Sequence, residues 1–144
     1  MGESSRLFVE LREKSALTYD FDVANVSGLD YGGFFINCPV RTKSLDAAQT
    51  VIREELIKIK TAPPSQNELD KSKNMLLGSI FRVMDNFHEL PRLLAYDEIH
   101  FETQNSLTDY TAKINSLTTQ DLTEVANKYF QDKNYSTAIL IPKK

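Results

Sequence analysis

Hydrophobic residues recur at spacings of three and four positions along residues 5–15, and charged residues lie between them. The apolar positions are Leu7, Phe8 and Leu11, and the charged positions are Glu10, Glu13 and Lys14. This spacing places the apolar side chains on one side of a helix and the charged side chains on the other. The pattern therefore predicts an amphipathic helix at the start of the chain, with Ser4 or Ser5 suited to its N-cap.

From Leu17 onward the period of the pattern falls from about 3.6 residues to two. Apolar side chains at alternate positions are Leu17, Tyr19, Phe21 and Val23. Alternation of this kind predicts a β-strand that follows the helix directly. At the junction, Arg12 would leave the end of the helix and Tyr19 the start of the strand, seven positions later.

A second strand is predicted over residues 31–40, after a turn at residues 27–30. The short link makes the two strands an antiparallel pair. Pro39 has no amide hydrogen, so it should lie near the end of this strand or at a free edge.

The middle of the chain predicts helices separated by capping and helix-breaking residues. Ser44 can cap the first of them, and Pro63 and Pro64 end it. Ser65 and Glu68 have the spacing of a capping box that opens the next helix, which should run to about residue 85. Further helices are expected over residues 86–101, 107–114 and 118–129, and a last strand over residues 136–141.

This order of elements predicts an α+β fold, in which helices cover one face of a small antiparallel sheet. A length of 144 residues favours a single domain over residues 1–144. The net charge of −3 gives no basic surface for a nucleic acid, and no apolar run is long enough to span a membrane. The single cysteine, Cys38, cannot form an internal disulfide, which favours a reducing compartment such as the cytoplasm.

Arg12 and Tyr19 are the residues most open to a functional interpretation. A guanidinium keeps its charge and a phenol donates one directed hydrogen bond, so together they can hold a peptide and its carbonyl groups, but neither is a nucleophile. The alternative is structural. Arg12 would then pair with a nearby glutamate, and Tyr19 would lie in the core with its hydroxyl bonded locally.

The segment SRLFVELREKSALTYDFDV resembles the C-terminal, non-zinc half of pitrilysin/insulinase-type zinc endopeptidases, the group that includes the mitochondrial processing peptidase. Near the end, the pattern Thr-x-x-Asp-Leu-x-x-Val-Ala-x-Lys-Tyr-Phe is also similar to that half. The resemblance covers nearly the whole chain. One departure is Ala16, where the family usually has glycine.

The resemblance implies a metallohydrolase-like fold of the LuxS and processing-peptidase type. In the family, strands and a helix precede the Ser-Arg-Leu-Phe motif, so we expect this chain to lack the first strands of the domain. It further implies a substrate-binding, non-catalytic half with no catalytic residues, in which Arg12 and Tyr19 contact the peptide. Zinc would belong to a separate zinc-bearing half, in the same longer chain or in another subunit.

The zinc signature of that group, His-x-x-Glu-His, has no counterpart in this chain. The two histidines, His88 and His100, are twelve positions apart, too far to share one helical turn. His88 and Glu89 imitate the start of the related His-Glu-x-x-His pattern, but Arg92 stands where its second histidine would be. We therefore expect no metal site in this chain and no peptide hydrolysis by it alone.

Two further interpretations stay open at the level of sequence. The chain can be an inactive member of the family that acts as an assembly or scaffold subunit, or a free-standing α+β domain with an unrelated role. A thin sheet leaves unpaired strand edges, which predicts self-association or pairing with another chain.

Overall fold

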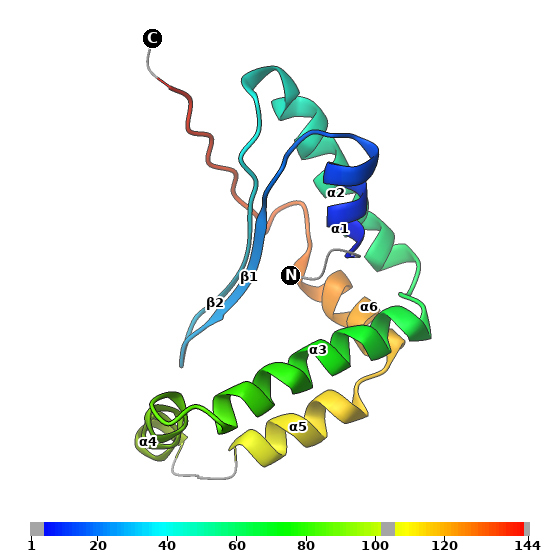
Figure 1. Ribbon diagram of the computed structural model, residues 1–144. Coiled ribbons are helices and arrows are strands. Elements are labelled where there is room, and N and C mark those ends of the chain that lie inside the picture. Colours follow the sequence, from blue (N-terminus) through cyan, green and yellow to red (C-terminus); the bar gives the residue numbers. More distant parts are fainter. Residues whose placement is uncertain (1–4, 102–105, 143–144) are drawn as a thin grey trace. The chain divides into compact units, whose positions relative to one another are not determined.

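The computed structural model describes residues 5–101 and 106–142, which fold into two compact units. Unit 1 comprises residues 1–61 and 126–144, and unit 2 comprises residues 62–125. The single domain expected from chain length stays a prediction. The α+β class is confirmed, because helices and an antiparallel β-hairpin make up the described residues (Figure 1).

Unit 1 is built on the hairpin of β1 (Asp22–Ser27) and β2 (Gly32–Asn37), as the alternating pattern predicts. The ladder begins with the pair Asp22 and Asn37 and ends with the pair Ser27 and Gly32 beside the turn. Helix α2 (Leu45–Thr61) follows a 3₁₀ turn, η2 (Thr42–Ser44), so Ser44 lies in this turn rather than at a helix N-cap.

The predicted first helix is α-helical for three residues only. Helix α1 (Arg6–Phe8) continues directly into η1 (Val9–Lys14), a π-helix whose closing bond runs from the Ser15 amide to the Glu10 carbonyl at 3.2 Å. Both segments pack on α2, and the centroids of the Phe8 and Phe21 rings lie 6.5 Å apart. A π-helix adds one residue per turn, and such turns often occur at functional sites.

Unit 2 is helical, and its sequence signals are confirmed. It contains α3 (Gln66–Met84), α4 (Glu89–Phe101), α5 (Ser106–Ser116) and the first part of α6 (Thr119–Tyr129). The Ser65 and Glu68 capping box is formed in both directions, with the Ser65 amide 2.8 Å from the Glu68 carboxylate. Reciprocal bonds of this kind satisfy two amides that the helix itself leaves unpaired.

The buried apolar residues form a small core in each unit. In unit 1 they are Leu11, Ala48 and Ala126, and in unit 2 they are Leu69, Ile80 and Ile114. Leu11 has 0% exposure, which makes it the largest fully buried side chain among the described residues. Within unit 1, the segment η1 is therefore anchored mainly through the buried side chain of Leu11.

The first strand begins five residues later than the sequence predicts, at Asp22 instead of Leu17. Continuing the β1–β2 register would pair Asp20 with Pro39. Pro39 has no amide hydrogen to donate to that pair, so the ladder ends at Asn37. Tyr19 consequently lies outside the strand, in the connection from η1 to β1.

The predicted last strand is wrong for the described part of the chain. Residues 136–141 are extended, but they pair with no described strand (Figure 1). Alternation and β-branched side chains suit a strand, yet a strand exists only as part of a ladder with a neighbour.

Replacing Leu11 by alanine should destabilise the protein by about 2–5 kcal/mol, because the change leaves a cavity at the one fully buried leucine. Chemical unfolding followed by circular dichroism measures the effect. Leu29→Ala is the control, because this leucine is exposed in the hairpin turn and should change stability by less than about 0.5 kcal/mol. Equal losses from the two variants would contradict the anchoring role of Leu11.

Candidate functional site

The candidate site is the bend between η1 and β1, residues 12–20, which carries both residues singled out by the sequence. Leu11, buried beneath the bend, accepts a hydrogen bond at its carbonyl from the Leu17 amide at 2.9 Å. This bond closes the end of the helix in a loop one residue longer than the usual Schellman closure. The bend is thus tied to the best-buried point of unit 1.

Ala16 turns the chain at this closure. Its φ of 46° makes it the one non-glycine residue with positive φ among the described residues. The left-handed region is costly for a residue with a Cβ, and glycine usually occupies this position after a helix. The position where the sequence departs from the family pattern is therefore the position that needs glycine's conformation.

Arg12 lies on η1 and is exposed. Its guanidinium carbon is 4.9 Å from the centre of the Phe8 ring, a cation–π contact that fixes the side chain along the helix. Glu10, the nearest acidic residue along the chain, pairs with Lys14 instead, at 2.7 Å. Within the described residues Arg12 makes no ion pair, so the structural alternative of an Arg–Glu pair is not what is observed.

Tyr19 lies in the connection between η1 and β1 with 85% of its surface exposed. The structural alternative, a core tyrosine on the apolar face of a strand, is therefore wrong. Its hydroxyl makes no hydrogen bond to another described residue, which leaves its donor and acceptor positions open to solvent or a ligand. Sequence reasoning placed the residue at the bend but assigned its side chain to the wrong environment.

Thr18, which the sequence did not single out, is the buried residue of the connection, with 6% exposure. Its hydroxyl oxygen lies 2.6 Å from the carbonyl of Asp20 and 2.6 Å from the carbonyl of Pro39, and the Asp20 amide is 3.3 Å from it. The signal for this role was the polar position beside Tyr19 together with Pro39, which cannot donate a ladder bond.

Cys38 lies next to Pro39 and is a half-buried free thiol. Burial raises its pKa, and a hydrogen bond with Thr18 acts in the opposite direction. A thiol with a raised pKa carries little thiolate at neutral pH and reacts slowly. Cys38 is therefore poorly suited to act as a nucleophile.

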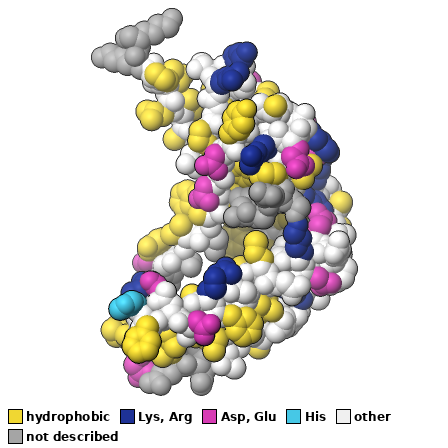
Figure 2. Space-filling model, viewed as in Figure 1, with side chains coloured by type: hydrophobic (Ala, Val, Ile, Leu, Met, Phe, Trp, Pro, Cys, Tyr) yellow, Lys and Arg dark blue, Asp and Glu magenta, His cyan; other side chains and the backbone are white. Residues whose placement is uncertain are grey.

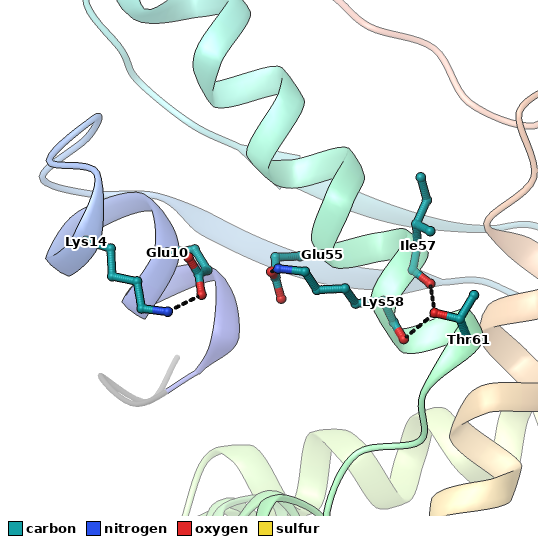
Figure 3. A network of polar contacts seen from close by, with 6 residues as sticks. All are labelled: Glu10, Lys14, Glu55, Ile57, Lys58 and Thr61. Carbon is teal, nitrogen blue, oxygen red and sulfur yellow. Dashed lines mark hydrogen bonds and ion pairs between the residues drawn. The ribbon is translucent and has the colours of Figure 1, made fainter.

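Charged side chains on the other side of η1 face α2 (Figure 3). The hydrogen bond from Lys14 lowers the pKa of Glu10, and the charge of Lys58 adds to this effect. Lys58 binds the buried Glu55, and this bond raises the pKa of Lys58. These pairs favour the charged forms of their side chains at neutral pH, and each lies within one element, the Glu10–Lys14 pair in η1 and the Glu55–Lys58 pair in α2.

No group of three or more His, Cys, Asp or Glu side chains lies close enough to hold a metal ion within residues 5–101 and 106–142. His88 is exposed, and its amide donates to the Asn86 side chain at 2.9 Å, as does the Glu89 amide at 3.0 Å. His88 thus lies directly before α4, which begins at Glu89. None of the described helices is both long and apolar enough to cross a lipid bilayer.

Lys and Arg side chains are interspersed with Asp and Glu on the face shown in Figure 2. This face therefore carries no continuous patch of one charge.

The family model of the peptidase M16 inactive domain matches residues 1–76, more than half of the chain. The chain therefore belongs to the family of peptidase M16 inactive domains, and the resemblance to the non-zinc half of such enzymes is confirmed.

Relatives and solved structures are consistent with this membership. The zinc protease PqqE of Helicobacter pylori is 31% identical over 142 residues, which is 98% of this chain and 32% of the relative. A Bacillus subtilis protein named as an inactive metalloprotease is 21% identical over 91% of this chain and 30% of its own length. The fold is similar to an inactive peptidase domain from Bordetella parapertussis, with a TM-score of 0.83 and 17% identity over 100% of this chain and 76% of that one.

The chain thus spans about a third of the length of the curated relatives it matches. Relatives from two organisms are named as zinc proteases, whereas the family that matches this chain is an inactive domain.

Ala16→Gly should stabilise the protein by about 1 kcal/mol, because glycine adopts the observed positive φ without the steric cost of a Cβ. Thermal or chemical unfolding measures the change. Ala47→Gly, on an exposed position of α2, is the control and should destabilise by about 1 kcal/mol. A loss of stability in Ala16→Gly would show that the left-handed turn is not a source of strain.

Proposed function

We propose that this chain is the substrate-binding, non-catalytic half of a zinc-dependent endopeptidase, and that its bend at residues 12–20 contacts the bound peptide. The observation that carries the proposal is the availability of Arg12 and Tyr19. Each is exposed on the same short bend, and neither side chain makes an ion pair or hydrogen bond to a described residue. A family that lacks catalysis in this domain leaves binding as the role for such groups.

The chemistry of the two groups suits a peptide backbone. Carbonyl oxygens of an extended peptide accept hydrogen bonds, and a guanidinium gives charge-assisted ones that strengthen as negative charge develops on the oxygen. A phenol adds a second, directed donor. Zinc and the activated water would come from a zinc-bearing half, in the same longer chain or another subunit, so this chain alone should not cleave peptides.

The proposed location is the cytoplasm. Support comes from the single cysteine, Cys38, which is a free, half-buried thiol rather than part of a disulfide. Free thiols are usual in reducing compartments.

Arg12→Ala should weaken peptide binding about tenfold or more, because it removes a charge-assisted hydrogen bond. The probe is an N-acetylated, C-amidated ten-residue peptide of Gly, Ser, Ala and Leu, titrated against the isotope-labelled protein by NMR. Cleavage of the same peptide after mixing with a chain that carries His-x-x-Glu-His gives a second measurement. There kcat/KM should fall by a similar factor.

The matched control is Arg41→Ala, which removes another exposed arginine of unit 1 without touching the bend. It should leave both binding and cleavage unchanged. If Arg12→Ala behaves like Arg41→Ala, the bend does not bind peptide and the proposal fails.

A second candidate function, an assembly or scaffold subunit, is favoured by the segment Ser136–Ile141. The segment is extended, and its backbone makes no hydrogen bond to any described residue. Leu140 is 99% exposed, with half-exposed Ile139 and Ile141 on either side. An uncharged, extended segment of this kind, rich in β-branched residues, is suited to pair with the free edge of another chain.

Under this second function the protein should self-associate, and Leu140→Lys should reduce the association by placing a charge on the fully exposed position. Sedimentation velocity over a range of protein concentrations measures the effect. Phe87→Lys is the control, because Phe87 is 91% exposed but lies in unit 2. A protein that stays monomeric at the highest concentration, or a loss of association in the control alone, would exclude pairing through this segment.

A further inference from the structure

We propose that Thr18 is the residue that positions Tyr19 for peptide binding, because its hydroxyl binds the carbonyls of Asp20 and Pro39 where the β1–β2 ladder has ended. This inference rests on the proposed function of the bend and names a residue that acts through Tyr19 rather than on the peptide itself. It starts from the unusual contacts of one buried hydroxyl group.

The first step is the break in the ladder. The register of β1 and β2 would place Asp20 opposite Pro39, two pairs beyond the last observed pair, Asp22 and Asn37. In an antiparallel sheet, opposite residues share backbone hydrogen bonds, but a proline has no amide hydrogen to give. The Asp20 carbonyl would therefore lack the amide donor that the partner strand normally supplies, and the Asp20 amide is bonded to the Thr18 hydroxyl oxygen instead of to the Pro39 carbonyl.

The second step is the substitute for the missing donor. The Thr18 hydroxyl lies 2.6 Å from both carbonyl oxygens, and it is shared between them because it has one hydrogen. Without this hydroxyl, two partly buried carbonyls would lose their partner, which is more costly than losing an exposed bond. The hydroxyl thus joins the connection before β1 to the segment after β2, across 21 positions of sequence.

The third step concerns Tyr19 itself. The Asp20 amide is 3.3 Å from the Thr18 hydroxyl oxygen, which is the arrangement of a threonine turn that encloses the residue in between. That residue is Tyr19. Its backbone is held on both sides by one buried group, while its ring is 85% exposed. The ring is therefore presented to solvent from a fixed base, as binding at low entropic cost requires.

The test compares Thr18→Val with Thr18→Ser in the NMR titration with the ten-residue peptide. Valine keeps the shape of threonine and removes the hydroxyl, whereas serine keeps the hydroxyl. Tyr19→Phe is expected to weaken binding about fivefold, as the loss of one neutral hydrogen bond does. Thr18→Val should give a similar loss, Thr18→Ser should bind as the parent protein does, and Thr18→Val with Tyr19→Phe should be no weaker than either single change.

Two controls separate positioning from general damage. Thr50→Val removes a threonine hydroxyl that binds the Asp46 carbonyl at 2.9 Å within α2, and it should not change peptide binding. Arg12→Ala should still weaken binding in the Thr18→Val background by its usual factor. Additive losses from Thr18→Val and Tyr19→Phe, or a loss in Thr50→Val of the same size, would overturn the inference.

A measurement without peptide distinguishes failure of this inference from failure of the proposed function. The heteronuclear ¹H–¹⁵N Overhauser effect reports the fast motion of individual amides. It should fall at Tyr19 and Asp20 in Thr18→Val and stay unchanged in Thr18→Ser and Thr50→Val. Unchanged values in Thr18→Val would overturn the inference. If instead the values fall but Tyr19→Phe binds peptide normally, the tether is real, the peptide role of Tyr19 is wrong, and the positioning role falls with it.

Discussion

A proline without an amide hydrogen ends the β1–β2 ladder, and a threonine hydroxyl binds the carbonyls beyond it. The arrangement of the bend depends on this hydrogen bonding by the threonine side chain. Had the ladder continued, Tyr19 would alternate with its neighbours as part of a strand, and its orientation would follow from the pleat. Instead the strand begins only at Asp22, and the bend before it can present a large side chain away from the core.

The other end of the bend is held by packing. Leu11 is fully buried and its carbonyl receives the Leu17 amide, so the helix end and the start of the connection share one anchor. The Glu10–Lys14 pair lies within η1 and is partly exposed, so it contributes little energy. Two anchors, one apolar and one polar, therefore enclose the segment that carries Arg12 and Tyr19.

The elements that the sequence predicted well are those determined by local signals. Capping residues such as Ser65 and Glu68, the helix breaker at Pro64, and the hairpin with its short turn each act within a few positions. The bend was predicted in place but not in detail. Helical periodicity does not distinguish a π-helix from an α-helix over six residues, and the tether between Thr18 and Pro39 joins residues that are 21 positions apart.

The predicted last strand also shows that local signals do not specify long-range contacts. Residues 136–141 have strand-like composition, but pairing depends on a neighbour that no local pattern specifies. For Tyr19 the error was one of environment. Alternation assigned Tyr19 to the apolar face of a strand. The strand begins only at Asp22, so Tyr19 is not part of it. The resemblance to a family supplied the interest in Arg12 and Tyr19, because their spacing alone fits a structural role equally well.

The left-handed alanine at the helix end has a consequence for how the bend is acquired. Ala16 gains nothing locally from its conformation, since an isolated chain would favour almost any other backbone angle at that position. A synthetic fragment that ends soon after residue 20 would therefore not take up the turn, because Pro39 and the buried environment of Leu11 are absent from it. The geometry of this surface is a product of the completed fold, assembled only once the hairpin has closed.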